Sequence, residues 1–173
     1  MFNMMLVQQV PVVDSFVILV GQGPGPDTSL SFVIHGEPPV QKRHRVAWKG
    51  LLGGWYRSNR RAPIIYDPSS QEKKRLAMAV KAAMQDFEVT GFPFFGIELP
   101  LVLDVRFFFP NKVGQAYPKK KDIDNMVKYI MDAMTGILYP NDTVVVRLTA
   151  EKTFAGEAST SVIIRTWNEN NND

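Results

Sequence analysis

The sequence predicts a single α+β domain in which two helices pack on one mixed sheet. Three observations point to this class. The chain has 173 residues and is 45% hydrophobic, which is enough for one substantial core. Two segments carry apolar residues at helical spacing, and four carry them at alternate positions. Their order along the chain is β-α-β-α-β-β, which suits helices packed against a mixed sheet.

Composition divides the chain into three parts. We assign residues 1–28 to an N-terminal arm or extension. The Gly/Pro run at Gly21–Pro26 is incompatible with a helix and is expected to separate this arm from the main domain. Residues 29–167 form the main domain. Residues 168–173 are a polar tail that we expect to be frayed.

The first half of the domain contains three predicted elements. Ser29–His35 is rich in β-forming residues and is predicted to be a strand. A helix is predicted over Pro68–Glu88, where Ser69 and Glu72 fit a capping box and Asp67 is an alternative N-cap ahead of Pro68. Glu98–Phe109 alternates apolar residues and is predicted to be a strand that stops at Pro110.

The second half contains the other three. Asp122–Thr135 is predicted to be an amphipathic helix that ends at Gly136. Thr143–Phe154 alternates apolar and polar residues, and Thr160–Trp167 is predicted to pair back with it after a turn.

Several classes of protein are excluded by what the chain lacks. It has no cysteine, which excludes disulfides, thiolate zinc sites and a cysteine nucleophile. It has no apolar run near the roughly 20 residues that cross a bilayer, and its start does not resemble a signal peptide. We therefore expect a cytoplasmic protein in a reducing compartment, with no membrane partner.

The net charge of +3 hides a strong segregation of charge. The segment Pro38–Tyr66 has no acidic residue and a net charge of +7, so the rest of the chain sums to −4. Its basic residues include Lys42, Arg43 and Arg45, and three aromatic residues lie among them. This composition suits contact with DNA phosphates and bases. Considered alone, it fits a solvated surface loop better.

The strongest candidate site is the start of the second predicted helix. Asp122 and Asp124 follow three lysines, Lys119, Lys120 and Lys121, and Lys128 lies one turn beyond Asp124. Each aspartate could simply cap the helix or favour its dipole. Alternatively, both carboxylates could bind one hard cation.

Chain length allows a third carboxylate to join this pair. A helix of fourteen residues advances about 21 Å, and seven extended residues from Gly136 span about 23 Å, so Asp142 could return beside Asp122 and Asp124. Three carboxylates together repel one another unless a cation holds them. Oxygen ligands favour Mg²⁺, with Mn²⁺ as a substitute.

A metal beside three lysines indicates a phosphate substrate, and Lys128 could neutralise charge in the transition state. Asp132 is interpreted first as a helix ion-pair partner of Lys128, four residues earlier, with a role in the site as the minority alternative. The two histidines, His35 and His44, are distant in sequence from the acids and are not assigned to catalysis.

These residues resemble the RusA-type Holliday-junction resolvases. The resemblance is carried by Asp122-Ile123-Asp124-Asn125, Lys128, Asp132, Tyr139 and Asn141-Asp142, and by the strand that ends in Glu151-Lys152. Gly36–Arg45 is similar to the early basic segment of that family. In total the resemblance covers Phe32 to Trp167. Two departures are Lys121, where a proline is common, and Asn141, where an acid is common.

The resemblance implies a homodimeric, Mg²⁺-dependent endonuclease that resolves four-way DNA junctions by paired symmetric cuts. Its role would lie in recombination, repair or viral genome processing. Asp122, Asp124 and Asp142 would then be catalytic metal ligands and Lys128 the catalytic lysine. Lys42, Arg43, Arg45 and Lys119–Lys121 are the predicted DNA-binding residues. A two-fold dimer would match the symmetry of the junction.

Three other functions compete with this one. A phosphatase with an Asp-x-Asp nucleophile needs the motif directly after a buried strand, which this chain does not have. A non-catalytic, structure-selective nucleic-acid-binding protein would use the aspartates only as caps, although acids beside DNA repel it. An interaction module is supported only by the aromatic run Phe92–Phe95, which is more typical of a core or a dimer interface.

Overall fold

The computed structural model describes residues 8–12, 15–21, 28–48, 63–85, 91–96 and 99–168. The described strands are β1 (Gln8–Val12), β2 (Ser15–Gly21), β3 (Ser29–His35), β4 (Arg45–Trp48), β5 (Pro63–Tyr66), β6 (Leu101–Pro110), β7 (Val145–Ala155) and β8 (Ser159–Thr166). The helices are α1 (Ser70–Gln85), α2 (Ile123–Met134) and the short 3-10 helix η1 (Asp142–Val144). The predicted α+β class with two packed helices is confirmed.

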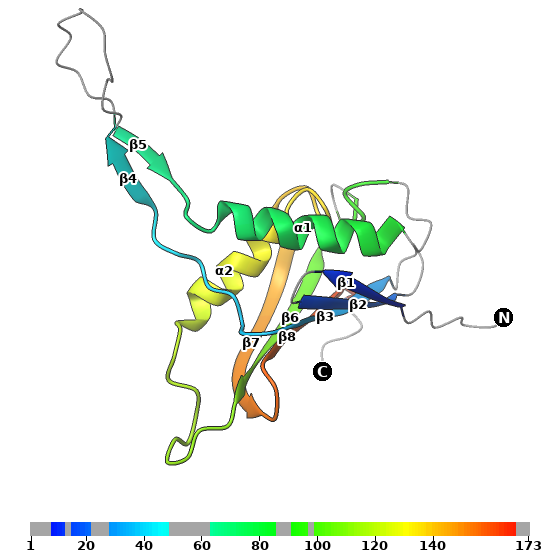
Figure 1. Ribbon diagram of the computed structural model, residues 1–173. Coiled ribbons are helices and arrows are strands. Elements are labelled where there is room, and N and C mark those ends of the chain that lie inside the picture. Colours follow the sequence, from blue (N-terminus) through cyan, green and yellow to red (C-terminus); the bar gives the residue numbers. More distant parts are fainter. Residues whose placement is uncertain are drawn as a thin grey trace, which may run out of the picture.

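Six strands form the main sheet, in the order β1-β2-β3-β8-β6-β7. All neighbours are antiparallel except β6 and β7, which run parallel. The predicted pairing of the last strand with the one before it is wrong, because β8 lies between β3 and β6 and β7 pairs with β6. Parallel pairing needs a crossover, and α2 with the loop before it supplies that crossover. The predicted N-terminal arm contributes β1 and β2, which extend the sheet beyond β3 (Figure 1).

The core lies between one face of this sheet and the two helices. Along β6, the side chains of Leu101, Leu103, Val105, Phe107 and Phe109 are buried, as the alternation predicted. Buried residues of β3 and β8 continue this face, and α1 and α2 cover it with Val80, Ala83, Met84, Met126, Ile130 and Met134. The aromatic segment 92–95 also packs here, since Phe95 is buried and Phe92 and Phe94 lie against the core.

Strands β4 and β5 form a separate two-stranded hairpin that projects from the body (Figure 1). Val46, Ile65 and Tyr66 are exposed on it. Residues 49–62 lie outside the described residues, and most of the predicted basic and aromatic loop Trp48–Arg61 falls there.

Helix α2 is held on the core by a broad apolar stripe, which explains why its limits match the prediction within one residue. Six of its twelve residues are buried. Gly136 follows with φ 81°, a left-handed conformation that glycine adopts without a steric penalty. Its N–H donates to the carbonyl of Tyr139 at 2.7 Å, which closes a turn directly after the helix.

No helix among the described residues is long and apolar enough to cross a membrane.

Candidate functional site

The first carboxylate of the motif stands at the start of α2 but does not cap it. Asp122 occupies the N-cap position with φ −77° and ψ 135°, yet its side chain makes no capping hydrogen bond. Asn125 approaches it at 3.5 Å, which is long for a hydrogen bond. The carboxylate is exposed. Asp122 therefore keeps its oxygens available, contrary to what a purely structural cap would show.

The backbone just before Asp122 is held from three sides. Lys121 has φ 61°, an uncommon conformation for a residue other than glycine. Its ammonium donates to the carbonyl of Pro38 and lies 3.2 Å from the carboxylate of Glu37. Its own carbonyl accepts a hydrogen bond of 2.8 Å from Lys152 of β7. These contacts fix the direction in which the chain enters α2, and therefore the place of Asp122.

Asp124 and Lys128 lie one turn apart on the exposed side of α2. Both are exposed. The helix buries Met126 and Val127, which lie between them in sequence, and Ile130, which follows. Residues at i and i+4 face the same way on a helix. The sequence placed an acid and a cation on one face of α2, and the structure leaves both open to solvent.

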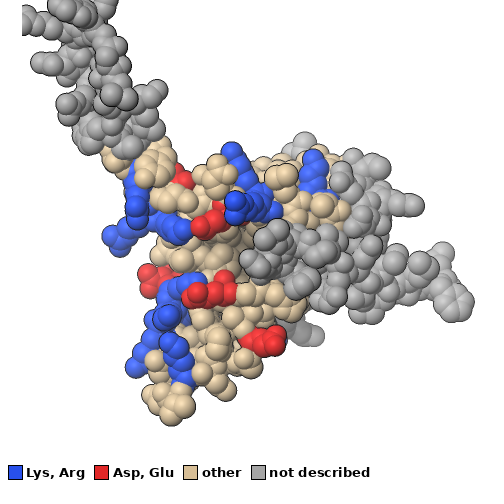
Figure 2. Space-filling model, in the orientation of Figure 1, with Lys and Arg blue, Asp and Glu red and all other residues tan. Residues whose placement is uncertain are grey.

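The early basic segment is hydrogen-bonded both to the start of α2 and to the residue before α1. The N–H of Gln41 donates to the carbonyl of Asn125 at 3.0 Å, and the N–H of Lys42 donates to Oγ of Ser69 at 2.9 Å. Residues that are some eighty positions apart in sequence thus meet beside Asp122 and Asp124. Figure 2 shows basic side chains in two groups along one side of the molecule, with acidic side chains between them.

The predicted DNA-binding residues differ in how free they are. Arg43, Arg45, Lys119 and Lys120 are exposed. Lys42 is also exposed but pairs with Glu72 at 2.8 Å, a surface contact worth at most about 1 kcal/mol. Lys121 turns toward Glu37 and Pro38 instead. Its ammonium is therefore engaged in contacts within the protein and is less available to a DNA phosphate than the other lysines.

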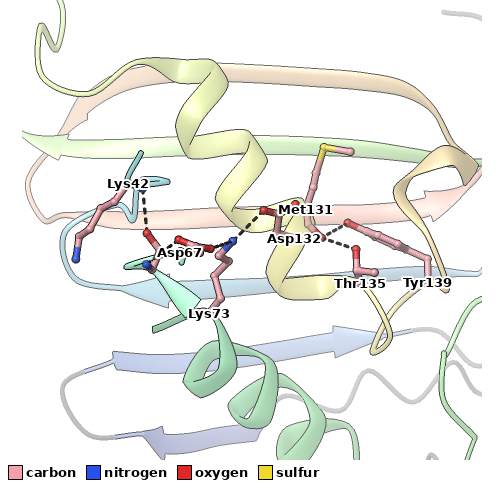
Figure 3. Close-up of polar contacts among 8 residues, drawn as sticks. Lys42, Asp67, Lys73, Met131, Asp132, Thr135 and Tyr139 are labelled. Carbon is pink, nitrogen blue, oxygen red and sulfur yellow. Dashed lines mark hydrogen bonds and ion pairs between the residues drawn. The ribbon is translucent and has the colours of Figure 1, made fainter. Parts of the chain in front are cut away.

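Asp132 has a partner that the sequence did not indicate. Its carboxylate lies 2.9 Å from the ammonium of Lys73 on α1, which also lies 2.6 Å from Asp67 (Figure 3). The interpretation of Asp132 as an ion-pair partner of Lys128 is wrong, because the structure pairs it with Lys73. Spacing along a helix shows only partners on the same helix, and Lys73 is 59 residues away.

The same network replaces the predicted capping box of α1. Oδ1 of Asp67 accepts a hydrogen bond of 2.8 Å from the N–H of Ser69. Asp67, the alternative N-cap in the sequence, therefore bonds to the backbone at the start of the helix. Oγ of Ser69 serves Lys42, and Glu72 pairs with the Lys42 ammonium. One set of polar contacts therefore joins the start of α1, the basic segment and α2.

The charges of this network alter the pKa values of its members. Burial alone would raise the pKa of Asp67, but hydrogen bonds from Lys73, the Ser69 N–H and Gln41 outweigh it and lower that pKa to about 2. For Lys73, burial alone would lower the pKa, but hydrogen bonds to Asp67 and Asp132 outweigh it and raise it. Both groups are therefore charged throughout the neutral range.

Asp142 lies near the other end of α2. The predicted extended return from Gly136 does not form, because residues 136–139 fold into the turn that follows the helix. The buried hydroxyl of Tyr139 donates to the carbonyl of Met131 at 3.1 Å. Burial raises the pKa of Tyr139, and the nearby charges of Asp142 and Asp132 raise it further. Asn141 caps η1 by accepting from the N–H of Thr143 at 3.2 Å, and Asp142 itself is exposed.

Within the part of the chain that the structure describes, no three acidic, histidine or cysteine side chains form a group that could hold a metal. The donor chemistry at the start of α2 nevertheless fits a hard cation. Asp122 and Asp124 offer exposed carboxylate oxygens that no cap consumes. Mg²⁺ is commonly bound by one or two carboxylates, with waters and substrate phosphates completing its shell.

Comparison with known proteins assigns the chain to a family. The profile of the endodeoxyribonuclease RusA family matches residues 36–165. This chain belongs to the RusA endodeoxyribonuclease family. The match includes the basic segment, both helices and strands β6 to β8, so it covers every residue discussed above as a site candidate.

A relative of similar length is also detected. The chain is 26% identical over 153 residues to the uncharacterized protein YqaN of Bacillus subtilis (strain 168). The alignment covers 79% of this chain and 95% of YqaN. The shared region therefore spans nearly the whole of that protein.

Membership of the RusA family makes this chain a DNA endonuclease of the Holliday-junction-resolvase class, as the motif predicted. The structure also gives positioning roles to three residues for which the sequence indicated none. Gln41 and Lys73 position α2 from other elements. Lys152, part of the family-like strand end, holds the carbonyl of Lys121. Nothing in their local sequence indicated these contacts, because each partner comes from a distant segment.

Proposed function

We propose that this member of the RusA family is a divalent-metal-dependent enzyme that resolves four-way DNA junctions by paired, symmetric hydrolysis of phosphodiester bonds. One observation carries the proposal. Two exposed carboxylates, neither used as a helix cap, stand at the start of α2, directly after Lys119–Lys121 and beside the basic segment that bonds to Asn125. A DNA backbone drawn to those cations passes the carboxylates.

Asp122 and Asp124 would hold the cation, which we propose to be Mg²⁺, with Mn²⁺ able to replace it. When bound, such a cation polarises a phosphoryl oxygen and favours deprotonation of water. Asp142 is proposed as a third catalytic carboxylate on the strength of the family resemblance. It lies after the end of α2, in η1, and does not form one group with Asp122 and Asp124, so this part of the proposal rests on the resemblance and not on geometry.

Lys128 is proposed to stabilise negative charge on the phosphate as the bond breaks. It is exposed, one turn from Asp124, and four residues from Asp132. Since Asp132 pairs with Lys73, the Lys128 ammonium is left to act on substrate. An aligned cation of this kind contributes more in the transition state than in the ground state.

The basic residues on each side of the carboxylates are proposed to bind DNA. Arg43 and Arg45 come from the segment that joins Asn125, and Lys119 and Lys120 come from the loop before α2. Their charges would offset the repulsion between the aspartates and DNA. We propose that the active form is a homodimer, because two matched cuts require two copies of the site related by a two-fold axis.

The deciding experiment uses a synthetic four-way junction with each strand labelled in turn. With Mg²⁺, we expect nicks at symmetric positions in two strands, and no cutting of linear duplex of the same sequence. Folded protein that binds the junction but cuts it with neither Mg²⁺ nor Mn²⁺ would contradict the proposal. That outcome would support the alternative, a non-catalytic structure-selective nucleic-acid-binding protein.

A matched pair of variants separates chemistry from binding. Asp124→Asn should abolish cleavage and leave junction binding equal or tighter, because it removes a metal ligand and a negative charge. Glu157→Gln, at an exposed acid in the turn between β7 and β8, loses the same charge and should cut normally. Full activity of Asp124→Asn would show that this residue only serves the helix.

A further inference from the structure

A pocket lies at the carboxyl ends of the two parallel strands. Phe109 of β6 and Phe154 of β7 are register partners, and both side chains line it. The loop 111–121 closes its other side. The cavity has a volume of about 260 Å³, and Glu37, Pro110, Gln115, Pro118 and Ala158 complete its wall with three lysines.

The three lysines of the wall are Lys112, Lys119 and Lys120. All are exposed, and none forms an ion pair with another described residue. The Lys119 ammonium lies 5.9 Å from the ring centre of Tyr117. The acid of the wall, Glu37, is paired with Lys121. An aromatic floor rimmed by cations is complementary to a flat ring that carries a phosphate.

The pocket is directly connected to the candidate site. Its wall ends at Lys120, and Lys121 and Asp122 follow in sequence. Lys121 is held by Glu37, which lines the pocket, and by Lys152 of β7, the strand that supplies Phe154. A DNA strand with a base in the pocket would therefore run past the carboxylates.

We propose that this pocket takes one unpaired base of a DNA strand, with Lys112, Lys119 and Lys120 on the neighbouring phosphates. The proposal deepens the proposed function, on which it rests for the identity of the strand as DNA. The volume is below the roughly 300–1,000 Å³ of pockets for drug-sized ligands, so it suits one base and not a base pair. Stacking is interrupted where strands exchange in a junction, and taking a base out of its helix costs least where its stacking or pairing is already weakened.

The test uses a 12-nucleotide single strand with one central 2-aminopurine and a 5′ fluorescein, without metal. Anisotropy gives the affinity, and 2-aminopurine fluorescence reports stacking. Gln115→Trp fills the pocket from its wall, and Val113→Trp adds the same ring to the fully exposed tip of the loop. We expect Gln115→Trp to weaken binding about tenfold, consistent with the loss of one stacked base. The fluorescence change that 2-aminopurine shows when it stacks on the unmodified protein should disappear. Equal affinities and signals for the two variants would overturn the proposal.

The lysines are tested by salt dependence. Replacing Lys112 and Lys119 by Ala should reduce the slope of log affinity against log salt by about 1.4, because each single-strand phosphate contact contributes about 0.7. An equal reduction with Lys74→Ala and Arg75→Ala, exposed residues of α1 outside the pocket, would contradict the assignment of phosphates to this rim.

Two further arms separate the outcomes. If a free deoxynucleotide monophosphate binds as tightly as the oligonucleotide, the occupant is a free nucleotide, and the strand assignment is wrong. Junction cleavage by the unmodified chain is measured in parallel. If the unmodified chain cuts the junction but does not stack 2-aminopurine, only the pocket proposal is overturned. Stacking without any cleavage overturns only the proposed function.

Discussion

The ammonium of Lys73 lies 2.9 Å from the carboxylate of Asp132 and joins α1 to α2. The same ammonium lies 2.6 Å from Asp67, and only 12% of the Lys73 side chain is exposed. One cation thus serves two acids from different elements. Because Asp132 is on the helix that presents Asp124 and Lys128, this contact helps to set where that helix stands.

Replacing Lys73 by Met should destabilise the fold by about 2–4 kcal/mol. The change leaves the Asp67 carboxylate, which is 17% exposed, and the more exposed Asp132 carboxylate without their cation. Loss of a partly buried pair costs more than loss of a surface pair. Urea unfolding followed by circular dichroism measures the loss. Arg106→Met is the matched control, because it breaks an exposed pair with Glu151 and should cost less than about 1 kcal/mol. Equal costs would show that the Lys73 network adds no more than a surface pair.

Asp67 should make stability depend on pH in the acid range. Its pKa is about 2 in the folded chain, below its ordinary value of 3.8. A group with a lowered folded pKa binds its proton more readily when unfolded, so its stabilising contribution is present above about pH 4 and is lost as pH falls toward 2. The stability difference between the unmodified chain and Asp67→Asn, measured in urea at pH 6, 4 and 3, should therefore shrink with falling pH. A constant difference would contradict the lowered pKa.

The segment 42–45 should supply salt-dependent affinity for DNA. Replacing Lys42, Arg43 and Arg45 by Ala should weaken junction binding and reduce the slope of log affinity against log salt by up to about 2.7, since each duplex phosphate contact contributes about 0.9. Fluorescence anisotropy at several salt concentrations measures the slope. Lys74, Arg75 and Lys81 on α1 offer a charge-matched control. An unchanged slope for the first set would move the DNA path elsewhere.

Lys152 should act as a positioning residue for Asp122. Lys152→Met removes the 2.8 Å hydrogen bond to the carbonyl of Lys121, so we expect cleavage to slow about tenfold or more, because small displacements of reacting groups are costly. Single-turnover rates should fall while junction Kd is nearly constant, and Lys152→Arg should restore part of the rate. Glu151→Gln, on the opposite side of the strand, is the control. A fall in binding with an unchanged rate would assign Lys152 to DNA instead.

Most of the secondary structure was predictable because it depends on local pattern. β3 has the predicted bounds, and α2 differs by one residue at each end. Alternation predicted the buried face of β6, and the order of elements predicted the class. The sequence did not show that β6 and β7 pair in parallel, or that β1 and β2 extend the sheet, because register between distant strands is decided by the shared core.

The site was predictable in part for a similar reason. Asp122, Asp124 and Lys128 lie within seven residues, so one helix start brings them together whatever the rest of the chain does. The return of Asp142 depended on a long extended segment, and the chain instead forms a turn stabilised by Gly136 and the Tyr139 hydroxyl. Asp132 was assigned to the wrong cation because its partner comes from another helix.

The sequence by itself determined the chemistry available to this protein: oxygen ligands without cysteine, a lysine one turn from an aspartate, and cations separated from acids. These follow from residue identity and short spacing, which folding cannot change. Only the tertiary structure decided which of those groups remain free. Packing of α1 on α2 brings Lys73 into contact with Asp132. Pairing of β7 with β6 brings Lys152 within hydrogen-bond distance of the Lys121 carbonyl. Contacts between distant segments satisfy some charges and leave Asp122, Asp124 and Lys128 to solvent.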